Sequence, residues 1–171
     1  KPLLMALLLS PMMVPLVITA LAAYFVFARV GLAGTFTGMI LAHTVLAVPF
    51  VVITVTATLQ GFDRNMVRAA QSLGARPIIA FFTVTLPMIT PGVISGAVFA
   101  FVTSFDEIVV ALFIASPAQF TLPRQLFSGL RDNLDPSIVA IATLLIVVSV
   151  SLMAVVELLR WRGERLTRAA K

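Results

Sequence analysis

Long apolar runs, each about as long as a bilayer is thick, constrain the fold of this chain more than any other feature of its sequence. A helix needs about 20 apolar residues to cross the hydrocarbon core of a membrane. Runs of roughly that length occupy residues 3–27, 36–59, 88–105 and 138–159. The sequence therefore predicts an all-α, polytopic membrane helix bundle with four spans in this chain.

Composition supports a membrane protein and argues against the soluble classes. Of the 171 residues, 60% are hydrophobic and 11% are charged, whereas a soluble domain carries about 25% charged residues. The net charge of +5 is better explained as a topology signal than as a nucleic-acid site, because so little of the chain lies outside the apolar runs. We therefore expect membrane lipid as a partner and no nucleic acid. Without cysteine and with one histidine, His43, the sequence predicts no metal site and no cofactor.

The distribution of basic residues predicts which side of the membrane each connection faces. Nine of the twelve Lys and Arg residues lie at the start of the chain, in the 60–86 connection or after the fourth run. The other three are Arg29, Arg124 and Arg131. Because Lys and Arg accumulate on the cytoplasmic side, we expect both chain ends and the 60–86 connection to be cytoplasmic. The turn at Arg29 and the 116–136 loop are then external.

The spans contain residues that bend helices and residues that let helices approach closely. The prolines in or beside them are Pro11, Pro15, Pro49, Pro87 and Pro91. A proline inside a helix removes a backbone hydrogen bond and kinks it. Small residues recur every fourth position in two series, Gly34–Gly38–Ala42 and Gly92–Gly96–Ala100. Such series allow close helix packing in lipid, either within one subunit or against a second one.

A polar segment between the second and third runs has the signals of two short helices and a tight turn. Asp63 is a good N-cap for a helix over residues 64–73. Gly74 would end that helix in the left-handed conformation, and Pro77 suits the first turn of the next helix.

The surface of this predicted helix is small and apolar at one place. Ala69 and Ala70 leave it shallow, and Leu73 adds an apolar knob. Such a helix could dock in the groove of a partner, or it could lie on lipid headgroups as an amphipathic connector. The residues alone leave both interpretations open.

Two acids stand at the end of the third run. Asp106 and Glu107 are followed by a second apolar run, 108–115, which is too short to span and either extends the third span or re-enters beside it. A helix that starts at Met88 reaches Asp106 after about 27 Å, near the outer boundary of the membrane. Acids between apolar runs line a water-filled path, serve a structural or gating role, or are simply solvated. Together with Phe101 and Phe105, carboxylates here could attract ammonium groups.

The polar segment also carries a recognisable pattern. Ala69-Ala70-x-x-x-Gly74, then nine residues, then Val84-x-Leu86-Pro87 resembles the EAA loop of the inner-membrane permeases of binding-protein-dependent ABC transporters. Val84 stands at the family's usual isoleucine position and Arg68 at its glutamate position. Residues 47–75, 102–117 and 121–147 resemble the spermidine/putrescine branch, its second permease subunit in particular. Family members usually have six spans, so we expect 1–171 to be one permease domain that lacks two N-terminal spans, with a coupling loop at 60–87.

The resemblance implies a subunit of an importer in the bacterial plasma (inner) membrane. A solute-binding protein would deliver a polyamine, and a second permease subunit would complete the path. A cytoplasmic ABC ATPase dimer would bind the coupling loop, whose contact residues are Arg68, Ala69, Ala70, Leu73, Gly74 and Pro87. From their chemistry toward ammonium groups, we expect Asp106, Glu107, Phe101 and Phe105 to line the cargo path. The chain has no G-x-x-x-x-G-K-[ST] sequence, so ATP hydrolysis is expected on the partner.

Other functions stay open at this point. Related branches of the family move ferric iron, phosphonate, thiamine or sulfate. An ATP-independent secondary transporter or channel would also show kinked helices and an intramembrane acid. A membrane enzyme would have to use His43 with the Asp106–Glu107 pair. No acid or nucleophile lies near His43 in the sequence, so we expect a backbone carbonyl or a neighbouring helix to satisfy this histidine and predict no catalytic residues.

Overall fold

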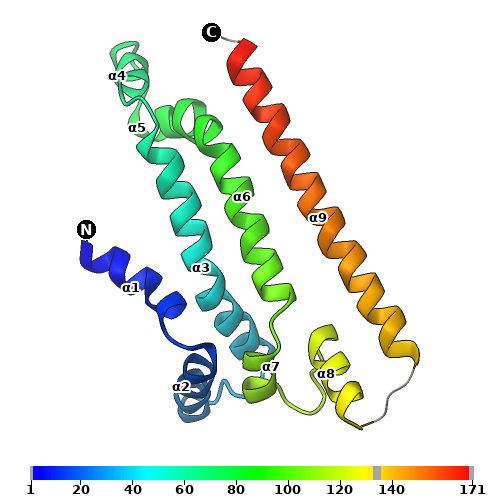
Figure 1. Ribbon diagram of the computed structural model, residues 1–171. Helices are drawn as coiled ribbons and strands as arrows, with labels where there is room; N and C mark the ends of the chain where they lie inside the picture. Colours follow the sequence, from blue (N-terminus) through cyan, green and yellow to red (C-terminus); the bar gives the residue numbers. More distant parts are fainter. Residues whose placement is uncertain (1, 133–135, 170–171) are drawn as a thin grey trace.

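Three long helices lie along one another and form the body of the molecule. The computed structural model describes residues 2–132 and 136–169, and that part of the chain is helical without strands. The long helices are α3 (Phe36–Gln60), α6 (Leu86–Phe105) and α9 (Pro136–Ala169), with α6 in contact with both others (Figure 1). The all-α fold predicted from the apolar runs is confirmed.

Shorter helices join and flank this body. Before α3 come α1 (Pro2–Met13) and α2 (Leu16–Arg29). Between α3 and α6 lie α4 (Asn65–Ser72), α5 (Pro77–Ala80) and the π-helix η1 (Phe81–Thr85). After α6 come α7 (Val109–Ile114) and α8 (Leu122–Asp132).

Three helical segments in the described part of the chain are long and apolar enough to cross a membrane. They are Phe36–Gln60, Pro77–Phe105 and Pro136–Val155. They confirm the second, third and fourth predicted spans. The third begins earlier than expected, because α5 and η1 continue without a break into α6. The chain is therefore a multi-pass membrane protein.

The first predicted span, residues 3–27, is not one continuous helix but two helices with a sharp bend between them. Helix α1 ends at Met13 and α2 begins at Leu16, and the two are bent by 108°. Pro15 explains the break, because it lacks an N–H and disfavours the helical conformation at Val14 before it. Pro11, by contrast, remains inside α1. The pair forms a broken span or a re-entrant segment, which gives up to four crossings.

The closest helix contact is between α3 and α6, where glycines face threonines. Gly92 packs against Thr58, and a Cβ atom added to Gly96 would lie 2.5 Å from Thr54 Oγ1 and 3.0 Å from Val51 Cα. The small-residue series on α6 thus serves packing within the subunit, one of the two uses the sequence left open.

The other small-residue series does not form one helix face. Gly34 lies in the turn before α3 with φ +73°, a conformation that suits glycine. Gly38 faces the carbonyl of Leu32, and only Ala42 reaches the core. The series at 34, 38 and 42 was therefore wrongly read as a helix-packing stripe.

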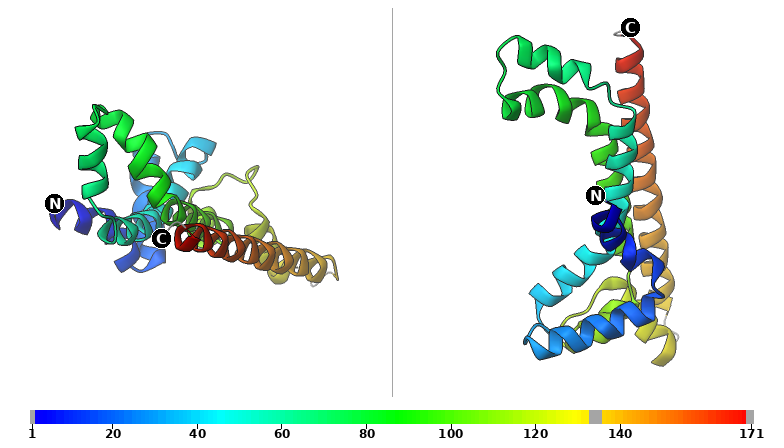
Figure 2. Two further views of the ribbon diagram at one scale, coloured as in Figure 1. Left: turned by 90° about the horizontal axis from the view of Figure 1, so that it is seen from above. Right: turned by 90° about the vertical axis from the view of Figure 1, so that its left-hand side faces the viewer.

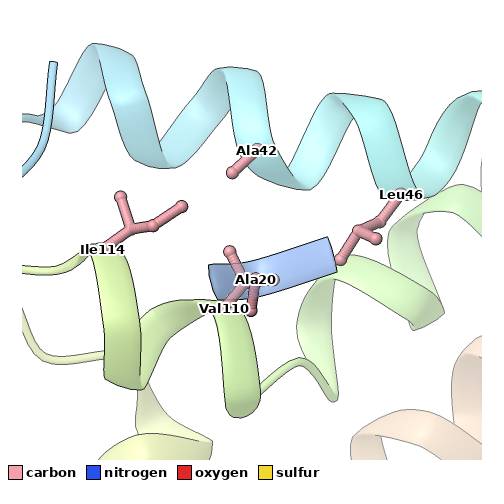
Figure 3. Packing of buried hydrophobic residues seen from close by; sticks show 5 residues of the cluster. All are labelled: Ala20, Ala42, Leu46, Val110 and Ile114. Carbon is pink, nitrogen blue, oxygen red and sulfur yellow. The ribbon is translucent and has the colours of Figure 1, made fainter. Parts of the chain in front are cut away.

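The apolar run at 108–115 forms the separate helix α7, which packs between α2 and α3 and does not lengthen α6. Its buried side chains meet those of α2 and α3 in a small core (Figure 3). The residues of this core are Ala20, Ala42, Leu46, Val110 and Ile114. The N–H of Gly34 also donates to the carbonyl of Ile114 at 2.8 Å, which fixes the end of α7.

The molecule has two distinct ends. The helices α4 and α5 and the C-terminal part of α9 lie at one end, and α2, α7 and α8 lie at the other (Figure 1). The helices α4 and α5, in or beside which Arg64, Arg68 and Arg76 lie, are therefore at the end opposite α2 and α8, which carry Arg29 and Arg124. Lys1 and Lys171, two of the basic residues in the topology prediction, lie outside the described residues.

Candidate functional site

The first candidate region is the α4–α5 hairpin, residues 63–80, which projects sideways from the end of the long helices (Figure 2). Asp63 was predicted as the N-cap, but α4 begins one residue later and its N-cap is Arg64, which makes no side-chain cap bond. The Oδ1 of Asp63 still accepts from the N–H of Asn65, the first residue of the helix, at 2.9 Å. Helix α4 covers Asn65–Ser72, somewhat less than the 64–73 expected.

The turn between α4 and α5 confirms the predicted left-handed glycine. Gly74 has φ +89°. Its N–H donates to the carbonyl of Gln71 at 2.9 Å, and the N–H of Ala75 donates to the carbonyl of Ala70 at 3.1 Å. These two bonds form a Schellman motif, which satisfies carbonyls that a helix end would otherwise leave unpaired. Pro77 then opens α5, as its position in the sequence predicted.

The hairpin exposes most of the residues predicted to contact a partner. Leu73 is 90% exposed at the end of α4. Arg68, Ala69 and Gly74 are exposed as well, and Ala70 is half-buried. Pro87 is exposed in the first turn of α6, apart from the α4–α5 hairpin itself. Burying a leucine side chain is worth about 1.5–3 kcal/mol, so Leu73 can contribute strongly to a docked complex.

The second candidate region is the acidic break, residues 106–108, between the end of α6 and the start of α7. Asp106 is exposed and borders two cavities. The larger measures about 600 Å³ and is also bordered by Glu107, by Phe50 of α3 and by Pro11 of α1. The smaller measures about 170 Å³ and is also bordered by Phe105 and by residues of α8 and α9.

Glu107 differs from its neighbour in being buried. One carboxylate oxygen accepts from the N–H of Val110 at 2.6 Å and the other from the N–H of Ala111 at 3.0 Å. Both amides belong to the first turn of α7, where no helical carbonyl is available to them. The sequence presented the two acids as one pair, and the structure gives them different surroundings.

His43 lies beside Glu107. Its Nδ1 is 2.8 Å from the hydroxyl oxygen of Ser104 on α6, and its Nε2 is 3.8 Å from Oε2 of Glu107. The expectation that a neighbouring helix satisfies this histidine holds for Nδ1 alone, because Nε2 has no hydrogen-bond partner among the described residues. Ser104 was missed by sequence reasoning, because 61 residues separate it from His43 and no local pattern connects them.

The two predicted aromatic residues lie together on α6. The rings of Phe101 and Phe105 are stacked with their centroids 5.5 Å apart. Phe105 borders the smaller cavity beside Asp106. In the described residues no group of three or more His, Cys, Asp or Glu side chains could hold a metal ion.

The segment 116–136, expected to be a loop, contains the helix α8, and that expectation was wrong. The sequence did carry a signal for it, because Leu122, Leu126 and Leu130 recur every fourth residue. Arg124 of this helix donates to the carbonyls of Ser116 at 3.1 Å and Gln119 at 2.8 Å. Its guanidinium also lies over the ring of Phe120.

Comparison with known proteins adds an independent finding. The family model described as "Binding-protein-dependent transport system inner membrane component" matches residues 1–162. The putrescine transport system permease protein PotI of Escherichia coli (strain K12) is 38% identical over 143 residues, 80% of this chain and 51% of that protein.

Two further relatives are spermidine/putrescine transport system permease proteins PotC. The one from Haemophilus influenzae is 33% identical over 148 residues, 86% of this chain and 58% of that protein. The one from Escherichia coli (strain K12) is 32% identical over 159 residues, 93% of this chain and 60% of that protein. The chain thus spans between half and three fifths of the length of these relatives.

Proposed function

This chain belongs to the family of binding-protein-dependent transport system inner membrane components, and from that premise we propose that it is a permease subunit of an ATP-driven importer. The α4–α5 hairpin is the observation that carries the proposal. A transport subunit that depends on ATP hydrolysis by another protein needs an exposed, rigid element that the ATPase can bind and move. The hairpin is exposed and closed by the backbone bonds around Gly74, and its turn carries the exposed Leu73.

The partner of the hairpin is a cytoplasmic ABC ATPase dimer. The pattern from Ala69 to Pro87 is typical of the family, and ATP is hydrolysed on the partner and not on this chain. The contact residues are Arg68, Ala69, Ala70, Leu73 and Gly74, with Pro87 closing the pattern. The coupling loop comprises residues 60–87, and residues 1–171 belong to one permease domain.

The cargo is a polyamine that a solute-binding protein delivers from outside. The named relatives transport putrescine or spermidine, whose ammonium groups need acceptors along the path. Asp106 is exposed between two cavities and Phe105 borders one of them, which supports a path that includes Asp106, Glu107, Phe101 and Phe105. A second permease subunit completes this path, with membrane lipid around both subunits.

The α4–α5 hairpin lies on the cytoplasmic side of the bacterial plasma membrane, and both chain ends are cytoplasmic. The basic residues of the hairpin support this orientation, because Lys and Arg are retained on that side. The helices α7 and α8, at the opposite end of the molecule, then lie near the external side, where the binding protein docks.

The test is purification of the complete complex from its native membrane, followed by an assay of ATP hydrolysis with the binding protein and different cargoes. An associated ATPase stimulated by a polyamine-loaded binding protein is the expected result. Stimulation only by ferric iron, phosphonate, thiamine or sulfate would keep the permease class and change the cargo. Uptake that proceeds without any ATPase would instead identify a secondary transporter.

A further inference from the structure

His43 lies where α3, α6 and α7 meet. One of its ring nitrogens faces α6, and the other faces the start of α7. Nδ1 pairs with the hydroxyl of Ser104 on α6 at 2.8 Å. Nε2 points to Glu107, the residue that bonds the first turn of α7. His43 itself belongs to α3, so the three side chains form a partly buried polar connection between α3, α6 and the start of α7.

The contacts of the two ring nitrogens favour one tautomer of His43. If Nδ1 carried the imidazole proton, the lone pair of Nε2 would face the carboxylate of Glu107, and the two would repel each other. With the proton on Nε2, the hydroxyl of Ser104 donates to Nδ1 and the Nε2–H points at the carboxylate. This arrangement makes His43 a donor toward Glu107.

The contact between His43 and Glu107 is close but not yet a hydrogen bond. The two atoms are 3.8 Å apart, and among the described residues Nε2 is buried without a hydrogen-bond partner. A hydrogen bond needs about 2.7–3.2 Å, so a shift of about 1 Å or less between α3 and the start of α7 completes it. A buried donor without a partner favours that shift, because leaving it unpaired is costly.

The bonds of Glu107 decide how the two acids divide their roles. Its oxygens already accept from Val110 and Ala111, and its side chain is 2% exposed. Asp106 is exposed and borders both cavities. Glu107 is therefore placed to hold the start of α7, while Asp106 is placed to meet a cationic solute.

We propose that His43 is a positioning residue of the transport path: through Glu107 and Ser104 it ties α3 to the acidic break and so keeps Asp106 in place for the cargo. This inference rests on the proposed permease function. It assigns a task to a partly buried histidine that the coupling and cargo roles above do not use.

Three substitutions of His43 separate its possible contributions. In His43→Gln the side-chain amide reaches the position of Nε2 and can still donate to Glu107. In His43→Asn the amide replaces Nδ1 and reaches Ser104 alone. His43→Leu removes both polar contacts and keeps an apolar volume. The control is Thr44→Val on the same helix, because the hydroxyl of Thr44 bonds the carbonyl of Ile40 in its own helix at an exposed site.

The measurements are polyamine uptake and polyamine-stimulated ATP hydrolysis by the complete importer in proteoliposomes, with membrane abundance as a check. We expect His43→Gln and Thr44→Val to stay within about threefold of the parent, and His43→Asn and His43→Leu to lose at least about tenfold. In a Glu107→Gln background, His43→Leu should add little further loss, because the two residues act as one unit.

The opposite results overturn the inference. Parental transport by His43→Leu would show that the polar contacts are unnecessary. Activity of His43→Asn without activity of His43→Gln would assign the role to Ser104 alone, and loss in both would show that a donor toward Glu107 does not suffice. Independent, additive losses in the Glu107→Gln background would also contradict it. If His43→Leu fails to accumulate, the Gln and Asn variants decide the matter.

A failure of the proposed function is distinguishable from a failure of this inference. If the parent complex shows no polyamine-stimulated hydrolysis, the function is wrong whatever the variants do. The thermal unfolding midpoint of the purified protein then gives an independent reading of the His43–Glu107 contact. Midpoint shifts that are non-additive between His43→Leu and Glu107→Gln support the contact, and additive shifts refute it.

Discussion

The α4–α5 hairpin and the acidic break both interrupt the helices of this chain, and they are built by opposite means. The hairpin is closed by backbone bonds between near neighbours, such as that from Gly74 to Gln71. The break is held by side chains. Glu107 bonds the start of α7, and beside it His43 bonds Ser104, which is 61 positions away in the sequence. The hairpin is exposed, whereas Glu107 in the break is buried.

The two kinds of stabilisation suit the two regions to different tasks. A hairpin stabilised by its own backbone keeps its shape while its outer surface stays available to another protein. A break stabilised by side chains of α3, α6 and α7 responds to any shift among these helices. The contact between α3 and α6 connects the two regions, since the hairpin joins these helices at one end and the break follows α6 at the other.

The largest effect is expected from a change in that shared contact. Gly96→Val would place a Cβ 2.5 Å from Thr54 Oγ1 and 3.0 Å from Val51 Cα, which forces α3 and α6 apart. Overpacking of this kind costs about 1–3 kcal/mol. We expect membrane abundance and the thermal unfolding midpoint to fall, and transport to be lost. Ala97→Val, on an exposed position of the same helix, is the control, and equal stability of the two variants would show that the regions do not depend on this contact.

The next effect isolates the hairpin. Gly74→Val should leave insertion and stability near the parent and uncouple ATP hydrolysis from uptake. A β-branched residue resists the left-handed conformation that Gly74 has at φ +89°, so α5 would leave α4 in another direction. We expect uptake per ATP hydrolysed to fall at least about tenfold. The measurement is uptake and hydrolysis on one set of proteoliposomes.

Gly61→Ala is the matched control for that experiment. Gly61 ends α3 beside the hairpin, but its φ of −85° suits any residue, and an added Cβ would meet only the carbonyl of Thr58 at 3.8 Å. This variant should behave like the parent. Normal coupling in Gly74→Val, or the same defect in both variants, would mean that the left-handed turn is not what the ATPase contact needs.

The same contrast explains what could be predicted from the sequence. Asp63, Gly74 and Pro77 act on their immediate neighbours, so the hairpin followed from local chemistry. Apolar length alone identified three of the helices that can cross a membrane. Apolar length could not place the bend at Pro15. The presence of a proline could not place it either, because Pro11 and Pro49 remain inside helices.

The acidic break was only partly predictable, since its structure depends on contacts between distant residues. The sequence showed that Asp106 and Glu107 lie between apolar runs. It gave no sign that the side chain of Glu107 would accept from the amides of Val110 and Ala111 or lie beside His43. The two acids consequently looked equivalent in the sequence, and their different burial appeared only in three dimensions.

A smaller, divided effect is expected from neutralising the two acids separately. Asp106→Asn should lower polyamine uptake about tenfold, because a hydrogen bond from an ammonium group to a charged carboxylate is worth about 1.5–3 kcal/mol. The unfolding midpoint of this variant should not change, because Asp106 is exposed. Glu107→Gln should lower the midpoint, since an amide has one acceptor oxygen where the carboxylate serves two backbone N–H groups. Parental uptake in both variants would remove the acids from the path, and an unchanged midpoint in Glu107→Gln would contradict its structural role.

The smallest effect on the protein is expected from single cysteines that report which side of the membrane each end faces. The whole comparison depends on this result, because the two regions are proposed to lie on opposite sides. The chain has no cysteine, so single cysteines can be introduced without further changes. Arg68→Cys reports on the hairpin. At the other end Ala118→Cys is a better probe than position 124, because Ala118 is exposed and Arg124 bonds two backbone carbonyls. Both variants should insert normally, and Ala118→Cys should also transport like the parent.

An impermeant maleimide added to intact cells should label the Ala118→Cys variant at once and the Arg68→Cys variant only after the membrane is opened. We expect this pattern because basic residues favour the cytoplasmic side, and Arg64, Arg68 and Arg76 cluster at the hairpin end. The reverse pattern would invert the chain and place the hairpin where no cytoplasmic ATPase can reach it. Labelling of both variants from outside would leave the two regions on one side of the membrane, which α3 and α6 could not permit as spanning helices.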